Sequence, residues 1–452
     1  MTPHSWLCSD ALLVPMDGPP EQPLGFVRRG SLRITGDRIA ALGELAPLPG
    51  ESVVSMHGAL LLPGFVQGHV HATQTLFRGL ADDLPLLPWL QQRIWPLEHA
   101  HDAESTRTSA DLTMAELLAG GTTTVQTMES VRHAEQTCDS ALAHGLVAIV
   151  ANCLMDQSGP GVPEGLPSSA RENLATTEAL WRTYHGRDGR LCTAVAPRFL
   201  LSVSADLAHA AVAFAAASGL RIHSHAGEHP DEVALVRQQF GRDYLEVLHD
   251  QGWLGPRTSL AHCVHTTARE RHLLAATDTA VLHCPSTNCK LGSGIAPIVD
   301  YLQRGVRVAL GADGAPCNNR LSQLAELRQM ALLQALASGP GALPAARALW
   351  LATRGGAAAL GLDHLVGSLR PGLRADCAVF DLGDPRLGGA DGAAGVPSQL
   401  VYAADERHLR HVLVGGRFAV RDGQPVGFDW RELRARAAAV LPAVLQRAGL
   451  AR

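Results

Sequence analysis

The chain has 452 residues, of which 46% are hydrophobic and 18% are charged, and its formal net charge is −5. This balance is typical of a folded globular protein and argues against intrinsic disorder. Because the chain is slightly acidic and contains no basic run, no nucleic-acid partner is expected.

Neither a membrane anchor nor a secretion signal is expected. No stretch of about 18 uninterrupted apolar residues occurs, and the N-terminus lacks a basic region ahead of an apolar run. The nine cysteines are odd in number, scattered and free of any Cys-x-x-Cys pair, which predicts a reducing cytoplasm. A homodimer or a higher homo-oligomer is the default expectation.

The N-terminal region, residues 1–60, predicts a small β unit. Short apolar runs at 10–14, 30–35 and 51–55 are separated by turns that contain Gly and Pro. These runs predict strands, and they need partners elsewhere in the chain to bury their apolar faces.

From residue 61 to residue 363 the pattern changes to short apolar runs that alternate with Ala/Leu-rich stretches of helical period. Eight such runs, each followed by a helical stretch, predict a (β/α)8 TIM barrel. The runs lie at 60–70, 122–127, 146–151, 191–196, 220–225, 258–262, 280–283 and 306–311.

After the barrel, residues 364–452 return to strands. The segments 366–381 and 411–420 read as strands with tight turns, and 429–452 has the composition of a terminal helix. We therefore expect residues 1–60 and 364–452 to form one composite β-sandwich domain with a C-terminal helix.

A metal site is indicated by polar residues that close the apolar runs. His69 and His71 are two apart, so on a strand they project to the same side and can bind one cation. His225 and Asp313 close two further runs, and the C-terminal face of a barrel carries its chemistry. We predict that His69, His71, His225 and Asp313 form a Zn-like ligand set that leaves room for a water.

Other interpretations of these residues stay open at this point. A His-x-His pair can be satisfied by backbone carbonyls instead of a metal. Glu228, three residues past His225, also stands at a helix start, where an acidic side chain favours the helix dipole. His262 can be a buried core histidine, and we interpret His223 and His265 as structural.

Four motifs give the chain a resemblance to the amidohydrolase superfamily. Within it they resemble the branch of S-adenosylhomocysteine and methylthioadenosine deaminases and triazine chlorohydrolases. The motifs are Pro63-Gly-Phe-Val-Gln-Gly-His-Val-His71, His225-Ala-Gly-Glu228, His283-Cys-Pro-Ser-Thr-Asn288 and Gly311-Ala-Asp-Gly-Ala-Pro-Cys-Asn-Asn319.

The resemblance implies a single Zn²⁺, or alternatively Fe²⁺, held by the four residues named above. It also implies catalytic roles. Asp313 takes a proton from the metal-bound water, Glu228 protonates the ring nitrogen beside the reacting carbon, and His262 positions the attacking hydroxide. Lys290 is the only lysine and follows the seventh run, so a lysine-bridged binuclear centre is not expected.

Substrate contacts are predicted around this site. The Pro-Arg-Phe stretch after the fourth run, which contains Arg198, resembles the corresponding stretch of guanine deaminases. The planar guanidinium of Arg198 suits a carbonyl or a carboxylate of the substrate. A structural salt bridge is the alternative. In the loop after the first run, Trp89 can cap an aromatic ring and Gln74 can read a ring edge. His283 can touch the substrate or brace the site.

We therefore predict a metal-dependent aminohydrolase that acts on C–N bonds in cyclic amidines, with a small heterocyclic substrate. The expected substrate is an adenosine-type nucleoside: S-adenosylhomocysteine, methylthioadenosine, 5′-deoxyadenosine or adenosine. The alternatives are guanine, 8-oxoguanine or pterin deamination, or hydrolysis of a chloro- or aminotriazine. A metal-binding scaffold without turnover predicts loss of the proton-carrying groups, yet Glu228, His262 and Asp313 are all present.

Overall fold

The computed structural model describes residues 5–388 and 394–451. Contacts divide the chain into two units. The first comprises the described residues of Met1–Gln67, Ala115–Thr124 and Ser322–Phe428, and the second comprises those of Gly68–Met114, Val125–Leu321 and Asp429–Arg452. Each unit is described separately below.

Eight strands run in sequence order around a parallel barrel. Neighbouring strands pair in parallel register, as in His225 of β11 against Ala261 of β12. A bridge between Val70 and Asp313 joins the first strand to the segment after the last, so the barrel closes beside the predicted metal ligands His69, His71 and Asp313. The strands are β6 (Phe65–Val70), β7 (Thr122–Met128), β8 (Val147–Ala151), β10 (Leu191–Pro197), β11 (Arg221–Ala226), β12 (Thr258–His262), β13 (Ala280–His283) and β14 (Val308–Leu310).

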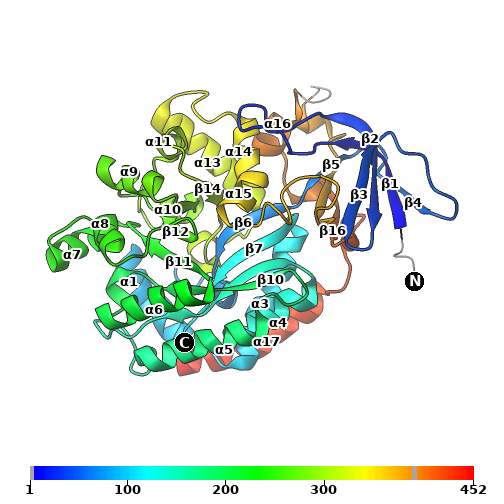
Figure 1. Ribbon diagram of the computed structural model, residues 1–452. Helices are drawn as coiled ribbons and strands as arrows, with labels where there is room; N and C mark the ends of the chain where they lie inside the picture. Colours follow the sequence, from blue (N-terminus) through cyan, green and yellow to red (C-terminus); the bar gives the residue numbers. More distant parts are fainter. Residues whose placement is uncertain (1–4, 389–393, 452) are drawn as a thin grey trace. The chain divides into compact units, whose positions relative to one another are not determined.

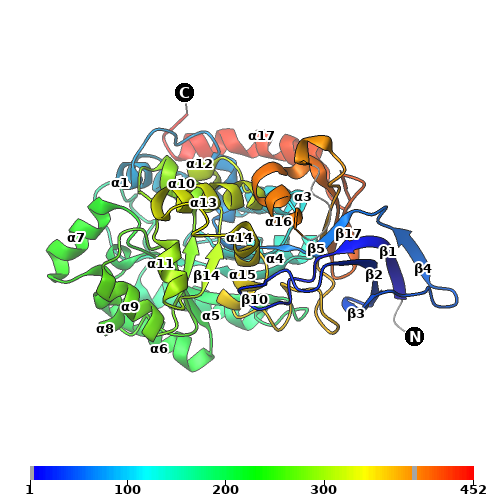
Figure 2. The same ribbon diagram turned by 90° about the horizontal axis from the view of Figure 1, so that it is seen from above.

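Several helices that follow these strands begin at defined capping residues. Ser169 caps α5 in a capping box with Glu172, and α5 ends before His185. Figures 1 and 2 show α5, α6 and α9 outside the barrel strands. The helices of this unit include α1 (Leu86–Trp89), α2 (Trp95–His99), α4 (Ala134–His144), α5 (Ala170–Tyr184), α6 (Ala205–Ser218), α7 (Pro230–Phe240), α8 (Tyr244–Asp250), α9 (Ala268–Ala276), α10 (Pro285–Lys290), α11 (Ile298–Gln303) and α12 (Ala315–Asn318).

A separate sheet combines strands from both ends of the chain. β1 pairs with β5 in parallel, and β5 pairs with β15 in antiparallel register. The strands are β1 (Ser5–Leu13), β2 (Arg28–Thr35), β3 (Arg38–Gly43), β4 (Ser52–Ser55), β5 (Leu60–Pro63), β15 (Cys377–Phe380), β16 (Leu409–Val414), β17 (Arg417–Arg421) and β18 (Gln424–Pro425). The predicted fold class, a (β/α)8 barrel with a small β domain built from both chain ends, is confirmed, and the strands of this domain belong to one nine-stranded sheet.

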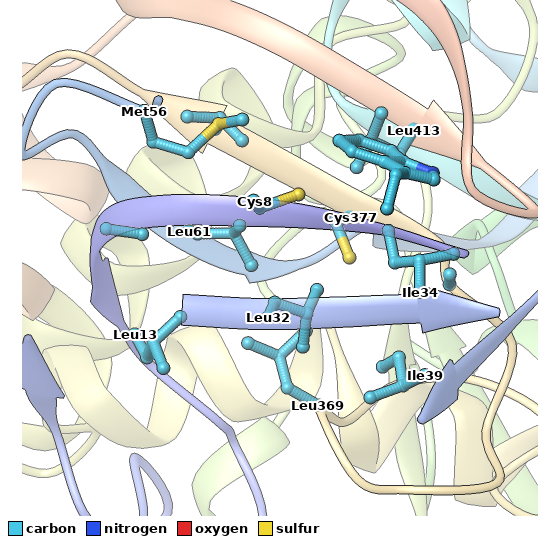
Figure 3. Close-up of a cluster of buried hydrophobic side chains, with 14 residues drawn as sticks. Cys8, Leu13, Leu32, Ile34, Ile39, Met56, Leu61, Leu369, Cys377 and Leu413 are labelled. Atoms are coloured by element: carbon cyan, nitrogen blue, oxygen red, sulfur yellow. The ribbon is translucent and has the colours of Figure 1, made fainter. Parts of the chain in front are cut away.

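The core of this sheet is an apolar cluster in which alternate residues of several strands meet (Figure 3). Leu32, Ile34 and Leu61 are fully buried, and the thiols of Cys8 and Cys377 lie among them. Burial raises the pKa of the Cys8 thiol to about 12, so the sulfur behaves as a small apolar group.

The C-terminal helix α17 (Trp430–Arg447), red in Figure 2, belongs to the barrel unit by its contacts. Val444 packs into a cluster with Leu76, Phe77 and Leu97. The sequence prediction instead joined this helix to the small domain. The predicted limits 1–60, 61–363 and 364–452 stay predictions, and residues 1–4, 389–393 and 452 lie outside the described residues.

No helix in the described part of the chain is both long and apolar enough to cross a bilayer.

Candidate active site

Four predicted metal ligands come together at the mouth of the barrel. His69 lies on β6, His71 directly follows it, His225 lies on β11, and Asp313 follows β14. One donor atom from each lies within 4.8 Å of all the others, and all four side chains are buried or nearly so. Gly311 permits this approach because a Cβ there would meet the backbone of His69 at 2.8 Å.

The outer nitrogens of the histidine rings are already engaged. His71 Nδ1 lies 2.7 Å from the Met128 carbonyl, and His225 Nδ1 lies 2.6 Å from the Arg198 carbonyl. A carbonyl can only accept, so each Nδ1 must carry the proton and each Nε2 must present a lone pair. These contacts fix the tautomer and orientation that metal-ligating histidines require.

The inner atoms face one another without an intervening donor. His71 Nε2 lies 3.2 Å from His225 Nε2, and Asp313 Oδ1 lies 3.3 Å from the Nε2 atoms of both His69 and His71. His69 Nε2 has no hydrogen-bond partner among the described residues. Facing lone pairs beside a carboxylate repel one another unless a cation lies between them, so this donor set fits a divalent metal ion.

The charges of these groups agree with that interpretation. Burial, followed by the charge of His69, lowers the pKa of His71 to about 3, so the ring is neutral at physiological pH. Burial opposes ionisation of Asp313, but its contacts with the histidines hold its pKa well below the usual range. Neutral imidazoles and one carboxylate are the forms in which these residues bind metals.

Glu228 and His262 lie beside the cluster. Glu228 Oε2 is 3.4 Å from His262 Nε2, and that nitrogen is 3.8 Å from Asp313 Oδ2. Burial raises the pKa of Glu228 well above its usual value, and the carboxyls of Asp313 and Glu232 add to the rise. Burial lowers the pKa of His262 to about 4. The site therefore places a buried carboxyl, whose environment favours the protonated form, next to a neutral imidazole.

Two of these residues have unusual backbone conformations. His262 has φ 71° and Asp313 has φ 62°, both in the left-handed region that non-glycine residues rarely adopt. Such conformations cost on the order of 1–3 kcal/mol and cluster at functional sites. Their occurrence at the ends of β12 and β14, the two strands that flank β13, agrees with a functional constraint on this face.

A pocket opens beside the cluster, and Trp89 and Arg198 are among the residues around it. Gln74 and His283 are fully buried but do not line this pocket, and both ring nitrogens of His283 lack a hydrogen-bond partner among the described residues. The lining residues are His71, Leu86, Trp89, Leu90, Arg198, Phe199, His225, Glu228, Glu232, His262 and Asp313.

Three further residues of this region were missed or misread in the sequence. His223 Nε2 lies 2.9 Å from His69 Nδ1; two positions from His225 on one strand, it shares that residue's face, and this spacing could have revealed it. Glu232 accepts the Glu228 backbone N–H at 2.9 Å. Glu98 forms an ion pair with Arg198, which lies 100 residues later in the chain, and no local sequence motif predicts this contact.

The family model described as "Amidohydrolase family" matches residues 60–419. The chain belongs to the amidohydrolase family. It is 32% identical over 436 residues to a 5-methylthioadenosine/S-adenosylhomocysteine deaminase from Moorella thermoacetica, covering 95% of this chain and 97% of the relative. It is 36% identical over 411 residues to a 5′-deoxyadenosine deaminase from Methanothermobacter thermautotrophicus, covering 90% and 93%.

Solved structures agree with this membership of the amidohydrolase family. An adenosine deaminase from Xanthomonas campestris with bound zinc superposes with a TM-score of 0.89 at 31% identity, covering 99% of both chains. Guanine deaminase from E. coli superposes with a TM-score of 0.84 at 27% identity, covering 93% of this chain and 100% of that one. A triazine hydrolase with a TM-score of 0.88 is 24% identical and supports the fold alone.

Proposed function

We propose that this amidohydrolase is a metal-dependent aminohydrolase that removes an amino group from an N-heterocycle as ammonia. The preferred substrate class is an adenosine-type nucleoside, such as 5′-deoxyadenosine, methylthioadenosine, adenosine or S-adenosylhomocysteine. The observation that carries the proposal is the convergence of three histidine Nε2 atoms and one carboxylate beside a buried acid in a pocket. The names of the relatives support the same chemistry.

His69, His71, His225 and Asp313 are the residues that would hold the metal, with one Zn²⁺ as the proposed ion and Fe²⁺ as the alternative. The bound zinc of the Xanthomonas structure supports this choice. A divalent cation at this position would act as a Lewis acid: it would make the attacking water more acidic and stabilise the negative charge that develops during the reaction. His223, by its contact with His69 Nδ1, would keep one ligand correctly oriented.

The proton steps fall to three side chains. The Asp313 carboxylate would accept a proton from the attacking water. Glu228, as a buried acid, would donate its proton to the ring nitrogen next to the reacting carbon, which makes that carbon more electrophilic. His262 Nε2, held from behind by Asn288 Oδ1 at 3.0 Å from Nδ1, would accept a hydrogen bond from the attacking water and orient it.

The departing amino group then needs a proton to leave as ammonia. Asp313, protonated in the first step and 3.8 Å from His262, would supply it. Protons and charges balance: one water proton passes through Asp313 to the leaving group, and the second returns to Glu228, which gave its own proton to the ring nitrogen. The oxygen of the water becomes the ring carbonyl as the C–N bond breaks.

The apolar part of the pocket suits a flat heterocycle. Trp89 is 4% exposed and lines the pocket together with Leu86 and Phe199. We propose that Trp89 packs against the ring and that Arg198 lies at its polar edge. Gln74 would act indirectly through Glu98, to which its Nε2 donates at 2.8 Å. His283 would brace the barrel interior below the site.

A second candidate is deamination of guanine, 8-oxoguanine or a pterin. Arg198 favours it, because a guanidinium at a pocket edge suits a ring carbonyl. The likeness to E. coli guanine deaminase also supports it. Triazine hydrolysis remains an alternative because the same attack reaches the same kind of carbon.

The test is ammonia release from the zinc-loaded protein across adenosine, 5′-deoxyadenosine, methylthioadenosine, S-adenosylhomocysteine, guanine, 8-oxoguanine, pterin and atrazine, with chloride measured for the last. Turnover of an adenine nucleoside supports the first proposal, and turnover restricted to keto-heterocycles favours the second. Absence of any product would refute an aminohydrolase.

We also propose a cytoplasmic location, which the nine free cysteines support.

A further inference from the structure

The basic side chain in the substrate pocket is not available to a ligand carboxylate. Arg198 is the only Lys or Arg among the described residues that line the pocket. Its Nη1 lies 2.5 Å from Glu98 Oε2, and its Nη2 lies 3.3 Å from Glu98 Oε1. The guanidinium therefore already forms a two-point ion pair of the kind it would offer to a carboxylate.

This ion pair is buried, and the side chain of Gln74 holds Glu98 in place by a hydrogen bond. The side chains of Arg198 and Glu98 are 4% and 1% exposed. Gln74 Nε2 donates to Glu98 Oε1 at 2.8 Å, which keeps the carboxylate facing Arg198. Separating the partners of a buried pair leaves an uncompensated charge and is strongly unfavourable. Glu98 is therefore not expected to yield its place to a substrate.

Among the described residues, the remainder of the pocket supplies no second Lys or Arg. Glu228, Glu232 and Asp313 also line it, so its other ionisable oxygens belong to carboxyls. Glu232 is 2% exposed, and its Oε1 has no hydrogen-bond partner among the described residues. An incoming carboxylate would lose its hydration without gaining a basic side chain as a partner, and such an unpaired buried charge costs affinity.

We propose that the Glu98–Arg198 pair makes the pocket selective for substrates without a carboxylate. The inference rests on the proposed function and narrows its substrate class. Nucleosides with an uncharged 5′ group, such as 5′-deoxyadenosine or methylthioadenosine, are accepted, whereas S-adenosylhomocysteine, which ends in an amino acid, is a poor substrate. Uncharged keto-heterocycles remain compatible, because a neutral carbonyl can accept from a guanidinium without displacing Glu98.

The experiment uses substrate pairs that differ in one charge. On the zinc-loaded wild-type protein, kcat/KM is measured for 5′-deoxyadenosine against adenosine-5′-carboxylic acid, and for pterin against pterin-6-carboxylic acid. For whichever pair is deaminated, we expect the anionic member to be at least about tenfold worse, the scale of one unpaired charged group. Anionic members within about threefold of the neutral ones would overturn the inference.

The variant Glu98→Gln tests whether the Glu98–Arg198 ion pair causes the selectivity against carboxylates. It keeps a side-chain oxygen for Gln74 but leaves Arg198 with its full charge, so the anionic-to-neutral ratio of kcat/KM should rise about tenfold or more. The matched control is the double variant Glu98→Gln/Arg198→Gln, whose pocket is again neutral at this point and whose ratio should stay near that of the wild type. An unchanged ratio in a folded Glu98→Gln protein would contradict the role of the pair.

Failure of the proposed function is distinguishable from failure of this inference. If no substrate releases ammonia, the aminohydrolase assignment falls, while calorimetric binding of the same matched pairs to the zinc-loaded protein still decides whether the carboxylate is excluded. If Glu98→Gln does not fold, the ratios of the wild type and of the double variant decide the question alone.

Discussion

Two buried regions of this molecule are built on opposite rules. The core of the small sheet consists of fully buried apolar residues such as Leu32, Ile34 and Leu61. The mouth of the barrel is as deeply buried, with His69 0% and Asp313 4% exposed, but its residues are polar or ionisable. Burial alone therefore does not distinguish a core that stabilises the fold from a site that performs chemistry.

The mouth also carries costs that the apolar cluster lacks. His69 Nε2 and Glu228 Oε1 are buried without hydrogen-bond partners among the described residues, and two residues have left-handed backbone conformations. Unpaired buried polar atoms and strained backbones each cost about 1–3 kcal/mol. Such costs persist where function requires them, so substitutions in the mouth should reduce activity more than stability, and those in the cluster the reverse.

The largest effect on activity is expected from His71→Ala, which removes a proposed metal ligand. We expect loss of tightly bound zinc and a fall in kcat/KM of at least about 10³-fold, because metal activation contributes several kcal/mol to the barrier. Metal content by atomic emission, measured beside turnover, checks this result. The control is His249→Ala, in an exposed histidine of α8. Full activity in a zinc-free His71→Ala protein would exclude a catalytic metal here.

Glu228→Gln should separate metal binding from proton transfer. The variant keeps the shape of the side chain but removes its transferable proton, so turnover should fall by about 10²–10⁴-fold with zinc retained. Thermal unfolding should show unchanged or higher stability, since an amide is easier to bury beside Asp313 and Glu232 than a carboxyl. Glu178→Gln, on the exposed face of α5, is the control. Loss of zinc from Glu228→Gln would instead mark Glu228 as a ligand.

The barrel and the metal cluster could be predicted because both follow from short-range rules. Strand and helix periods mark the eight units, and a side chain at the C-terminal end of a barrel strand faces the common mouth wherever it lies in the chain. His69, His225 and Asp313, far apart in sequence, could therefore be assigned to one site.

The features that the sequence did not predict depend on contacts between residues far apart in the chain, which no local sequence pattern encodes. Arg198 was interpreted chiefly as a substrate ligand, but its partner Glu98 lies on the short helix α2 (Trp95–His99) and has no motif of its own. The packing of α17 against Leu76 and Phe77 likewise depends on contacts between residues that are distant in the sequence. His223 was interpreted as structural from the sequence, although its two-residue spacing from His225 places both on one strand face. Its contact with His69 makes it a candidate positioning residue.

A smaller effect is expected from His223→Gln, in a residue that touches a ligand but not the metal. Removal of an outer partner of a metal ligand typically lowers metal affinity by about 10–100-fold. Zinc affinity measured by chelator competition should show this loss, while kcat at saturating zinc should change much less. His265→Gln is the matched control, because His265 Nε2 hydrogen-bonds to the Ser293 carbonyl and, among the described residues, His265 is not part of the metal-ligand cluster. Equal zinc affinities in the two variants would make His223 a packing residue.

The smallest effect on activity is expected from Leu61→Ala in the sheet cluster. Truncating this fully buried side chain should lower the free energy of unfolding by about 2–5 kcal/mol through lost burial and the cavity that remains. The exposed Leu336, 78% accessible, gives the matched control Leu336→Ala, which should change stability by less than about 0.5 kcal/mol.

The informative quantity for Leu61→Ala is kcat per folded molecule, measured well below the unfolding temperature. We expect it to stay near that of the wild type, because Leu61 packs among apolar side chains of the sheet cluster and none of the proposed metal, proton or substrate residues belongs to that cluster. A tenfold loss of kcat with zinc retained would show that the sheet core is coupled to the barrel mouth. The two regions would then have to be treated as one functional unit, and the division of labour between an apolar core and a polar site would fail for this protein.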